Sequence, residues 1–303
     1  MNVVAKLGLI SMLVSGSVMA LDYKTVSGAG GVPINVAETG DKSKPAIVLI
    51  HGFAQSHTSF KKQLESADLA RDFHLVAMDL RGHGNSGKPW DQAAYHDSKN
   101  WADDVIVVMD ATGVQQAVLV GWSFGGFVIA NVVDHYGVDR IVGVNLVGSA
   151  GGMVQPMFPT PPNNPELAKK RAETTRLQAS GSIEDNVQGS IGGIEFLTAK
   201  PGDQTWQDIS RAGSVLLLPY VRKALAGRNL DNTKVVPKFG NVPVLVTYGS
   251  ADGLIGPDQI AGLKKLQNVK FSVIEGSGHS PFYEDGPRFN RELADFVKSA
   301  FAR

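Results

Sequence analysis

The chain has 303 residues, 43% of them hydrophobic, enough for the core of one large domain or of one domain with an insertion. Its 29 Lys and Arg residues balance 29 Asp and Glu residues, so bulk charge gives no reason to expect binding to nucleic acid. The absence of cysteine excludes disulfides, thiolate metal sites and a cysteine nucleophile.

The N-terminal segment has the pattern of a secretory signal peptide. Lys6 precedes an apolar stretch from Leu7 to Val14, and Val18-Met19-Ala20 places small residues at the cleavage positions. We therefore assign residues 1–20 to a signal peptide and expect an exported protein, periplasmic or secreted; a helix that stays on the domain is the alternative. The run is too short and too interrupted by Gly and Ser to span a membrane, and no later segment is expected to span one.

Two short segments around a glycine cluster predict a hairpin. Residues 23–27 and 33–38 have the composition of strands, and Gly28-Ala29-Gly30-Gly31 lies between them as the turn. A phosphate-binding loop is the alternative. No helix follows these glycines, however, and no Lys-Ser/Thr pair is present, so the pattern favours the hairpin.

From residue 46 to residue 149, apolar strand-like runs alternate with helix-like segments. Strands are predicted at 46–50, 74–79 and 141–147 and in the run that begins at Val118, and helices at 59–70 and 101–112. This alternation predicts a doubly wound, mostly parallel sheet, which binds ligands beyond the carboxyl ends of its strands. His51, Asp79, Ser123 and Gly148 each follow a strand end, so they should lie along one edge.

The pattern changes at residue 150. Helical stretches follow near residues 165–180, 183–199, 203–212 and 214–226, without a strand signal. We interpret residues 150–236 as a helical cap inserted between the core segments 21–149 and 237–303. The alternation then resumes, with strands at 243–248 and 270–275 and helices at 257–266 and 288–301.

Residues 121–125, Gly-Trp-Ser-Phe-Gly, form a G-x-S-x-G pattern between a predicted strand and a predicted helix. The pattern alone is weakly specific in a glycine-rich chain. Strand, sharp turn and helix, however, are the context of a nucleophile elbow, and Gly121 and Gly125 would let strand and helix approach closely. Ser123 is the only serine that meets the pattern and is the candidate nucleophile; an ordinary turn serine is the alternative.

An acid and a base follow the last two predicted strands. Asp252 and His279 lie in turns that contain glycine, and with Ser123 they supply the acid, base and nucleophile of an acyl-transfer site. Their order along the chain, Ser, Asp, His, is the one that this arrangement requires on a doubly wound sheet. Asp258 and Glu275 are alternative acids, although Asp258 belongs more naturally to the first turn of the helix that follows it.

The other histidines show no spacing typical of metal ligands, so we expect no metal and no cofactor. We interpret His51 and His83 as residues that hold loops rather than as reacting groups.

Five motifs make the chain resemble the α/β-hydrolase family over essentially residues 22–303. They are His51-Gly52-Phe53, Asp79-x-Arg81-Gly82-x-Gly84-x-Ser86, the Ser123 elbow, Tyr248-Gly-Ser-Ala-Asp252 and Gly278-His279-Ser280-Pro281. Within the family, the chain looks closest to small-capped serine esterases and cofactor-free haloperoxidase-like perhydrolases. The resemblance implies an α/β-hydrolase fold, hydrolysis of carboxylic esters through an acyl-enzyme, and an oxyanion hole formed by the backbone N–H groups of Phe53 and Phe124.

Aromatic residues near the proposed site indicate a mainly apolar pocket, which suits esters with small or medium acyl groups. We assign substrate contact to Trp122 and Phe282; packing of the cap onto the core is the alternative role for such residues. The cap offers further apolar side chains, namely Met153, Met157, Phe158 and the run 215–218. No cluster of arginines in the sequence marks an anionic substrate.

Serine at the elbow argues against epoxide hydrolases and haloalkane dehalogenases, which have aspartate there. Perhydrolases, lactonases and carbon–carbon bond hydrolases keep serine and remain alternatives. A non-catalytic ligand-binding protein on the same scaffold is the alternative from another class, and the presence of all three candidate triad residues argues against it. The expected partner is a small-molecule ester; no sequence feature indicates an oligomeric state.

Overall fold

The computed structural model describes residues 20–155 and 165–303. The predicted signal peptide lies outside the described residues apart from Ala20, and so do Met157 and Phe158, two of the apolar residues that we assign to the cap.

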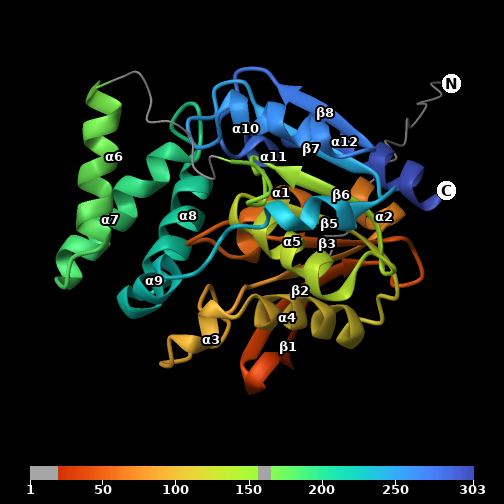
Figure 1. The fold of residues 1–303 in the computed structure, drawn as a ribbon, viewed down its shortest axis with the longest axis horizontal. Helices are drawn as coiled ribbons and strands as arrows, with labels where there is room; N and C mark the ends of the chain where they lie inside the picture. Colours follow the sequence, from red (N-terminus) through yellow and green to blue (C-terminus); the bar gives the residue numbers. More distant parts are fainter. Residues whose placement is uncertain (1–19, 156–164) are drawn as a thin grey trace, which may run out of the picture.

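Eight strands form one sheet in the order β1-β2-β4-β3-β5-β6-β7-β8 (Figure 1). β1 and β2 pair as the predicted antiparallel hairpin, β2 is antiparallel to β4, and the remaining neighbours are parallel. The strands are β1 (Asp22–Ser27), β2 (Pro33–Gly40), β3 (Ala46–Ile50), β4 (His74–Met78), β5 (Ala117–Trp122), β6 (Ile141–Val147), β7 (Val244–Gly249) and β8 (Val269–Ile274). The mostly parallel, doubly wound sheet predicted from the sequence is confirmed.

The central strands are apolar along their whole length because both faces of the sheet are covered. Side chains of a strand alternate between faces, and in β3 Ile47 and Leu49 join one buried cluster while Val48 and Ile50 join another. All four are fully buried, and each such side chain contributes about 1.5–3 kcal/mol to folding relative to an exposed position.

Helices cover the two faces in separate sets. Side chains of α1, α2 and α12 pack into the cluster that contains Ile47, whereas those of α4, α5 and α10 pack into the cluster that contains Val48. These helices and the two short ones beside them are α1 (Lys61–Leu64), α2 (Ala67–Asp72), α3 (Ala93–His96), α4 (Ser98–Ala111), α5 (Phe124–Tyr136), α10 (Pro257–Gly262), α11 (Pro281–Glu284) and α12 (Gly286–Phe301). The described residues also form the short 3-10 segments η1 (Ala29–Gly31), η2 (His57–Phe60), η3 (Ile194–Phe196), η4 (Thr233–Phe239) and η5 (Leu263–Lys265).

The helix predicted at 59–70 is broken into η2, α1 and α2. Ser66 begins α2 as its N-cap, and the Ser66 side chain accepts a hydrogen bond from the Leu69 N–H at 3.3 Å. The capping serine therefore starts a new helix where the hydrophobic pattern alone indicates a continuous one.

Between β6 and β7, the described residues form four helices: α6 (Pro165–Gln178), α7 (Ile183–Gly193), α8 (Gln204–Leu216) and α9 (Pro219–Ala226). They stand together at one side of the molecule, on the left in Figure 1. Their N-termini have local causes: Ser182 and Asp203 cap α7 and α8, and Pro219 begins α9 at the position where proline is tolerated. The break expected near residue 213 lies instead at Leu217–Leu218.

Gly213 stays inside α8 because it serves packing rather than helix termination. A Cβ at this position would lie 3.0 Å from the Gln55 Cα, so the glycine lets α8 approach the loop that follows β3. Within residues 20–155 and 165–303, every helix falls short of the length and hydrophobicity that a membrane span requires.

Candidate active site

Ser123 lies in the sharp turn between β5 and α5, with φ 51° and ψ −112°. Non-glycine residues rarely adopt this conformation, which costs on the order of 1–3 kcal/mol. The turn needs small neighbours: a Cβ at Gly125 would lie 2.1 Å from the Ile50 carbonyl oxygen, and one at Gly121 would lie 2.7 Å from the Gly125 backbone. The close approach of strand and helix predicted from the two glycines is confirmed.

Two hydrogen bonds fix the backbone of this turn. The Ser123 N–H donates to the Val147 carbonyl at 2.9 Å, and the Ser149 hydroxyl donates to the Ser123 carbonyl at 2.7 Å. Both partners belong to the end of β6 or the residues just after it, so the neighbouring strand holds the strained serine in place.

Asp252 and His279 form a hydrogen-bonded pair beyond the ends of β7 and β8. Their side chains are 1% and 3% exposed, and His279 Nδ1 lies 2.8 Å from Asp252 Oδ2. With Nδ1–H donating to the carboxylate, the neutral ring keeps Nε2 free to accept a proton. Gly148 makes room for the pair, since a Cβ there would lie 3.0 Å from His279 Nδ1.

The loop that carries His279 is held on both sides. The Gly278 N–H donates to the Glu284 carboxylate at 2.7 Å, and Trp122 Nε1 donates to the His279 carbonyl at 2.8 Å. Burial raises the pKa of Glu284, while hydrogen bonds from the backbone of Ala199, Gly278 and Ser280 act in the opposite direction. These contacts position the ring of His279 rather than leaving it to swing freely.

The two alternative acids lie elsewhere. Asp258 is exposed in the first turn of α10, and Glu275 is exposed in the turn after β8. Asp252 is the acid that the structure brings to His279.

Ser123 and His279 line the same cavity, which has a volume of about 390 Å³ and is called the Ser123 cavity below. No hydrogen bond joins the Ser123 hydroxyl to His279 among the described residues; such bonds often tighten only when substrate is bound. An adjoining, larger hollow of about 1070 Å³ shares Ser123, Phe53 and Phe127 with it and extends along α9. Ser123 and His279 therefore open onto one space.

Of the two residues expected to form the oxyanion hole, Phe53 lines the cavity together with Ser123, and Phe124 follows Ser123 in the chain. Phe124 is the first residue of α5, where N–H groups have no partner within the helix. Phe53 follows Gly52, whose added Cβ would lie 3.2 Å from the Ser123 Cβ. Neither amide donates a hydrogen bond to another described residue, so both are available to an oxygen bound beside Ser123.

Trp122 and Phe282 have different surroundings. Trp122 is fully buried and forms part of the cavity wall. Phe282 is also fully buried, but its ring packs 5.0 Å from that of Phe60 and 4.9 Å from that of Trp122, and it does not line the Ser123 cavity. The assignment of Phe282 to substrate contact is therefore corrected: α11 turns this ring into the core beneath Trp122.

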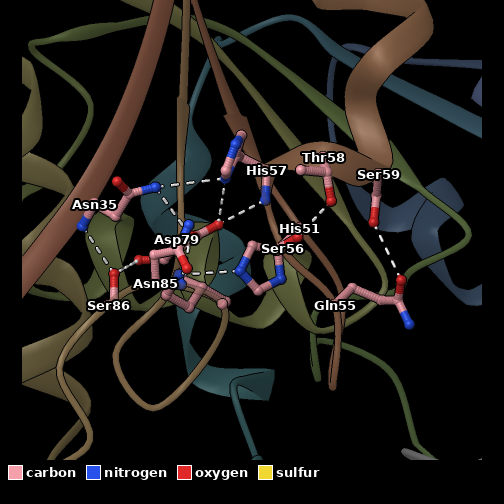
Figure 2. Close-up of polar contacts among 12 residues, drawn as sticks. Asn35, His51, Gln55, Ser56, His57, Thr58, Ser59, Asp79, Asn85 and Ser86 are labelled. Carbon is pink, nitrogen blue, oxygen red and sulfur yellow. Dashed lines mark hydrogen bonds and ion pairs between the residues drawn. The ribbon is translucent and has the colours of Figure 1, made fainter. Parts of the chain in front are cut away.

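Asp79, at the end of β4, is the centre of a closed polar network (Figure 2). Oδ1 accepts hydrogen bonds from the His57 N–H and from His57 Nδ1, at 2.7 and 2.8 Å. Oδ2 accepts from Asn35 Nδ2 and from the Asn85 N–H, at 3.0 and 2.8 Å. Burial raises the pKa of Asp79, but the hydrogen bonds from His57 and the charges of His57 and His51 outweigh it and hold the pKa at about 2. Together the four donors tie β2 and two loops to the end of β4.

His51 and His83 lie in the same loop region and are fully buried. His51 Nδ1 donates to the Gly52 carbonyl at 2.7 Å and Nε2 accepts from the Leu80 N–H at 3.0 Å, an arrangement that only the neutral ring allows. Burial lowers the pKa of His51 to about 4 and that of His83 to about 3. Both act as loop-holding residues. In the described part of the chain, no three His, Asp or Glu side chains are grouped as a metal site.

Two arginines that the sequence did not single out line the Ser123 cavity. Arg171 comes from α6 and Arg222 from α9, and no Asp or Glu lines the cavity with them in the described residues. Thr174, Gln178 and Ser214 add further polar groups, so the wall is more polar than the apolar pocket predicted from the aromatic residues. No sequence signal could have revealed the arginines, because they are 51 positions apart in a polar helical segment.

Comparison with known proteins identifies the fold family. A family model described as alpha/beta hydrolase fold matches residues 45–286. The bifunctional esterase/perhydrolase DCH of Acinetobacter calcoaceticus is 29% identical over 281 residues, which cover 89% of this chain and 97% of that protein. Among solved structures, a candidate aryl esterase from Burkholderia cenocepacia is 30% identical with a TM-score of 0.84, over 93% of this chain and all of that one. An esterase from Rhodococcus sp. is 29% identical with a TM-score of 0.79, over 92% and 99% of the two chains.

Proposed function

Because the chain belongs to the alpha/beta hydrolase fold family, we propose that it hydrolyses carboxylic esters through an acyl-enzyme formed on Ser123. The observation that carries the proposal is the 2.8 Å hydrogen bond between Asp252 and His279, at a cavity that His279 shares with Ser123. The esterases among its relatives and structural neighbours support the same reaction class.

In the proposed mechanism, His279 Nε2 takes the proton of the Ser123 hydroxyl as its oxygen attacks the ester carbonyl. Asp252 keeps the ring in the required tautomer and stabilises the imidazolium that forms. The developing oxyanion accepts hydrogen bonds from the amides of Phe53 and Phe124; loss of one such donor typically costs about 3–4 kcal/mol of transition-state stabilisation.

The tetrahedral intermediate then collapses, and His279 gives its proton to the departing alcohol. A water molecule repeats the attack on the acyl-enzyme with the same base, which releases the acid and restores Ser123. Small or medium acyl groups are the proposed substrates, since the Ser123 cavity of about 390 Å³ lies between the core and the helices that we assign to a cap at residues 150–236.

Perhydrolysis is a second reaction open to the same acyl-enzyme. Hydrogen peroxide would replace water as the attacking nucleophile and release a peracid, again regenerating Ser123. The similarity to a bifunctional esterase/perhydrolase favours this possibility over the lactonase and carbon–carbon hydrolase alternatives. Peracid formation from acetate and peroxide, and its loss in a Ser123→Ala variant, would test it.

Export is proposed on sequence alone. Lys6, the apolar run from Leu7 to Val14 and the small residues that end at Ala20 support cleavage near position 20 and release to the periplasm or the medium. N-terminal sequencing of the protein recovered outside the cytoplasm should begin near Leu21, and recovery of intact Met1 there would contradict cleavage.

The direct test of the esterase proposal is Ser123→Ala. We expect kcat for a 4-nitrophenyl ester to fall by about 10⁵-fold or more, since removing the nucleophile disables the whole triad. Labelling by a fluorophosphonate should disappear in the same variant. Ser214→Ala is the matched control, because it removes another hydroxyl from the cavity wall, and kcat should change by less than about tenfold. Ester turnover near the wild-type rate in Ser123→Ala would refute the proposal.

A further inference from the structure

Arg222 is a buried cation without a counter-charge. The residue is 8% exposed, and its Nη2 donates to the Ser190 hydroxyl at 3.3 Å and to the Ser214 carbonyl at 3.1 Å, both neutral acceptors. Nη1 is buried and has no hydrogen-bond partner among the described residues. Burial lowers the pKa of Arg222 to about 10, and no carboxylate acts on it in the opposite direction. A buried charge in such surroundings is costly for the fold.

The position of Arg222 places this charge at the reaction site. It lines both the Ser123 cavity and the adjoining hollow, at the place where the two share Ser123 and Phe53. Its guanidinium carbon lies 5.2 Å from the centre of the Phe53 ring, which belongs to the residue proposed to donate a backbone N–H to the oxyanion. A cation–π contact with one ring is weaker than a salt bridge in the same buried position.

The other charged groups around the cavity leave this charge unbalanced. Burial lowers the pKa of Arg171, which is also in the wall, although Asp252 lies near enough to act in the opposite direction. The adjoining hollow adds exposed Lys223. No Asp or Glu of residues 20–155 and 165–303 lines either space. The cavity around the nucleophile therefore carries a net positive charge, which favours binding of a negatively charged ligand.

A second buried arginine, Arg228, shares the lack of a counter-charge, since its Nε and Nη1 have no hydrogen-bond partner among the described residues and burial lowers its pKa to about 9. Arg228 donates to Asn131 Oδ1, and its guanidinium carbon lies 4.5 Å from the Trp101 ring centre and 5.2 Å from that of Phe124. It is sandwiched in the core and lines neither the Ser123 cavity nor the adjoining hollow. Arg222 differs because it meets the space where substrate binds.

We propose that Arg222 selects ester substrates that carry a carboxylate, with its guanidinium as the counter-charge of that group. This inference rests on the proposed esterase function and makes the substrate class narrower. Arg222 is a specificity residue here: it binds the anionic end of the substrate and takes no part in bond making. For a dicarboxylic half-ester, water adds, the alcohol leaves, and the new acid loses its proton, giving a dianion.

The test compares charged and neutral substrates of the same size. On the acyl side the pair is monomethyl glutarate and its amide, methyl glutaramate; on the alcohol side it is acetoxyacetate and acetoxyacetamide. The wild-type protein should show a higher kcat/KM for the carboxylate member of at least one pair, and the arm in which this happens identifies the end of the ester that faces Arg222. A preference for the amide in both pairs would overturn the proposal.

Arg222→Met should lower kcat/KM for the preferred carboxylate substrate by roughly 10- to 100-fold, the loss expected when a hydrogen bond between charged groups is removed. For the amide partner, kcat/KM should fall by less than about threefold. Arg222→Lys, which keeps the charge, should retain part of the preference. Arg211→Met is the matched control: it removes an exposed arginine from α8 and should leave the ratio unchanged. An equal fall for both members in Arg222→Met would mean a structural role only.

The two proposals fail in different ways. Ester hydrolysis that does not depend on Ser123 would refute the esterase assignment. Hydrolysis that depends on Ser123, without preference for a carboxylate, would refute the role of Arg222 alone. If Arg222→Met does not fold, the wild-type ratios and the Arg222→Lys variant still decide the question.

Discussion

Two Asp–His pairs of this protein have the same local geometry and different surroundings. In both, a histidine Nδ1 lies 2.8 Å from a carboxylate oxygen, and in both the two side chains are at most 3% exposed. Asp252 and His279 stand at a cavity with Ser123, whereas Asp79 and His57 lie inside a loop network (Figure 2).

The difference lies in what else each carboxylate and each ring contacts. Asp79 accepts four hydrogen bonds, two on each oxygen, so its pair is closed. Asp252 also accepts from the backbone, with Oδ1 bound by the Leu254 and Ile255 N–H groups and lying 3.1 Å from His279 Nδ1. Its Oδ2, however, has His279 as its one donor among the described residues. The pair itself therefore does not define an active site; a cavity and a nucleophile beside the ring do.

The largest expected effect is the loss of activity when Asp252, the acid of the pair at the cavity, is replaced. In Asp252→Asn, the amide nitrogen can take the place of Oδ2 and donate to His279 Nδ1, which forces the ring proton onto Nε2 and removes the base. We expect kcat for a 4-nitrophenyl ester to fall by roughly 10⁴-fold. Asp79→Asn, the matched variant of the closed pair, should change kcat of the folded protein by less than about tenfold. An equal loss of kcat in both variants would contradict the different roles assigned to the two Asp–His pairs.

The stability of the same two variants should follow the opposite order. In Asp79→Asn the new NH₂ group faces two donors whichever way the amide turns, and the His57 and Asn85 backbone N–H groups cannot change tautomer. We expect the free energy of unfolding to fall by about 2–4 kcal/mol. Asp252→Asn should cost less than about 1.5 kcal/mol, because the His279 ring can adapt. Urea denaturation at neutral pH measures both values, and a larger loss in Asp252→Asn would contradict the account.

A smaller effect is expected on the pH dependence of stability, through the buried His83. Burial holds the pKa of His83 at about 3, below its ordinary value of 6.5. The unfolded chain therefore takes up a proton below pH 6.5 while folded His83 stays neutral down to about pH 3, so stability falls as the pH drops through this interval.

His83→Asn keeps a donor for the Arg81 carbonyl and removes the titrating group. Between pH 7 and pH 5, the variant should lose about 2 kcal/mol less free energy of unfolding than the wild-type protein. Urea denaturation at the two pH values gives this difference directly, independent of any constant loss of stability. An unchanged slope would show that His83 does not contribute to it.

Sequence alone predicted the parts of this protein that depend on local pattern. Alternating apolar runs indicated the sheet and its direction, because a strand covered on both faces must be apolar throughout. The G-x-S-x-G turn indicated the elbow, because only glycine fits at positions 121 and 125. The order of Ser123, Asp252 and His279 indicated one edge of the sheet, because parallel strands end on the same side.

Only the tertiary structure decided which side chains meet. It turned Phe282 into the core beneath Trp122, although the residue is three positions from His279. It gave Asp79 and Asp252 the same contact with a histidine, but it placed Asp79 in a loop network and Asp252 at the cavity. It also brought Arg171 and Arg222 from separate helices to one cavity. Such contacts depend on how helices pack through space, and spacing along the chain carries no record of that packing.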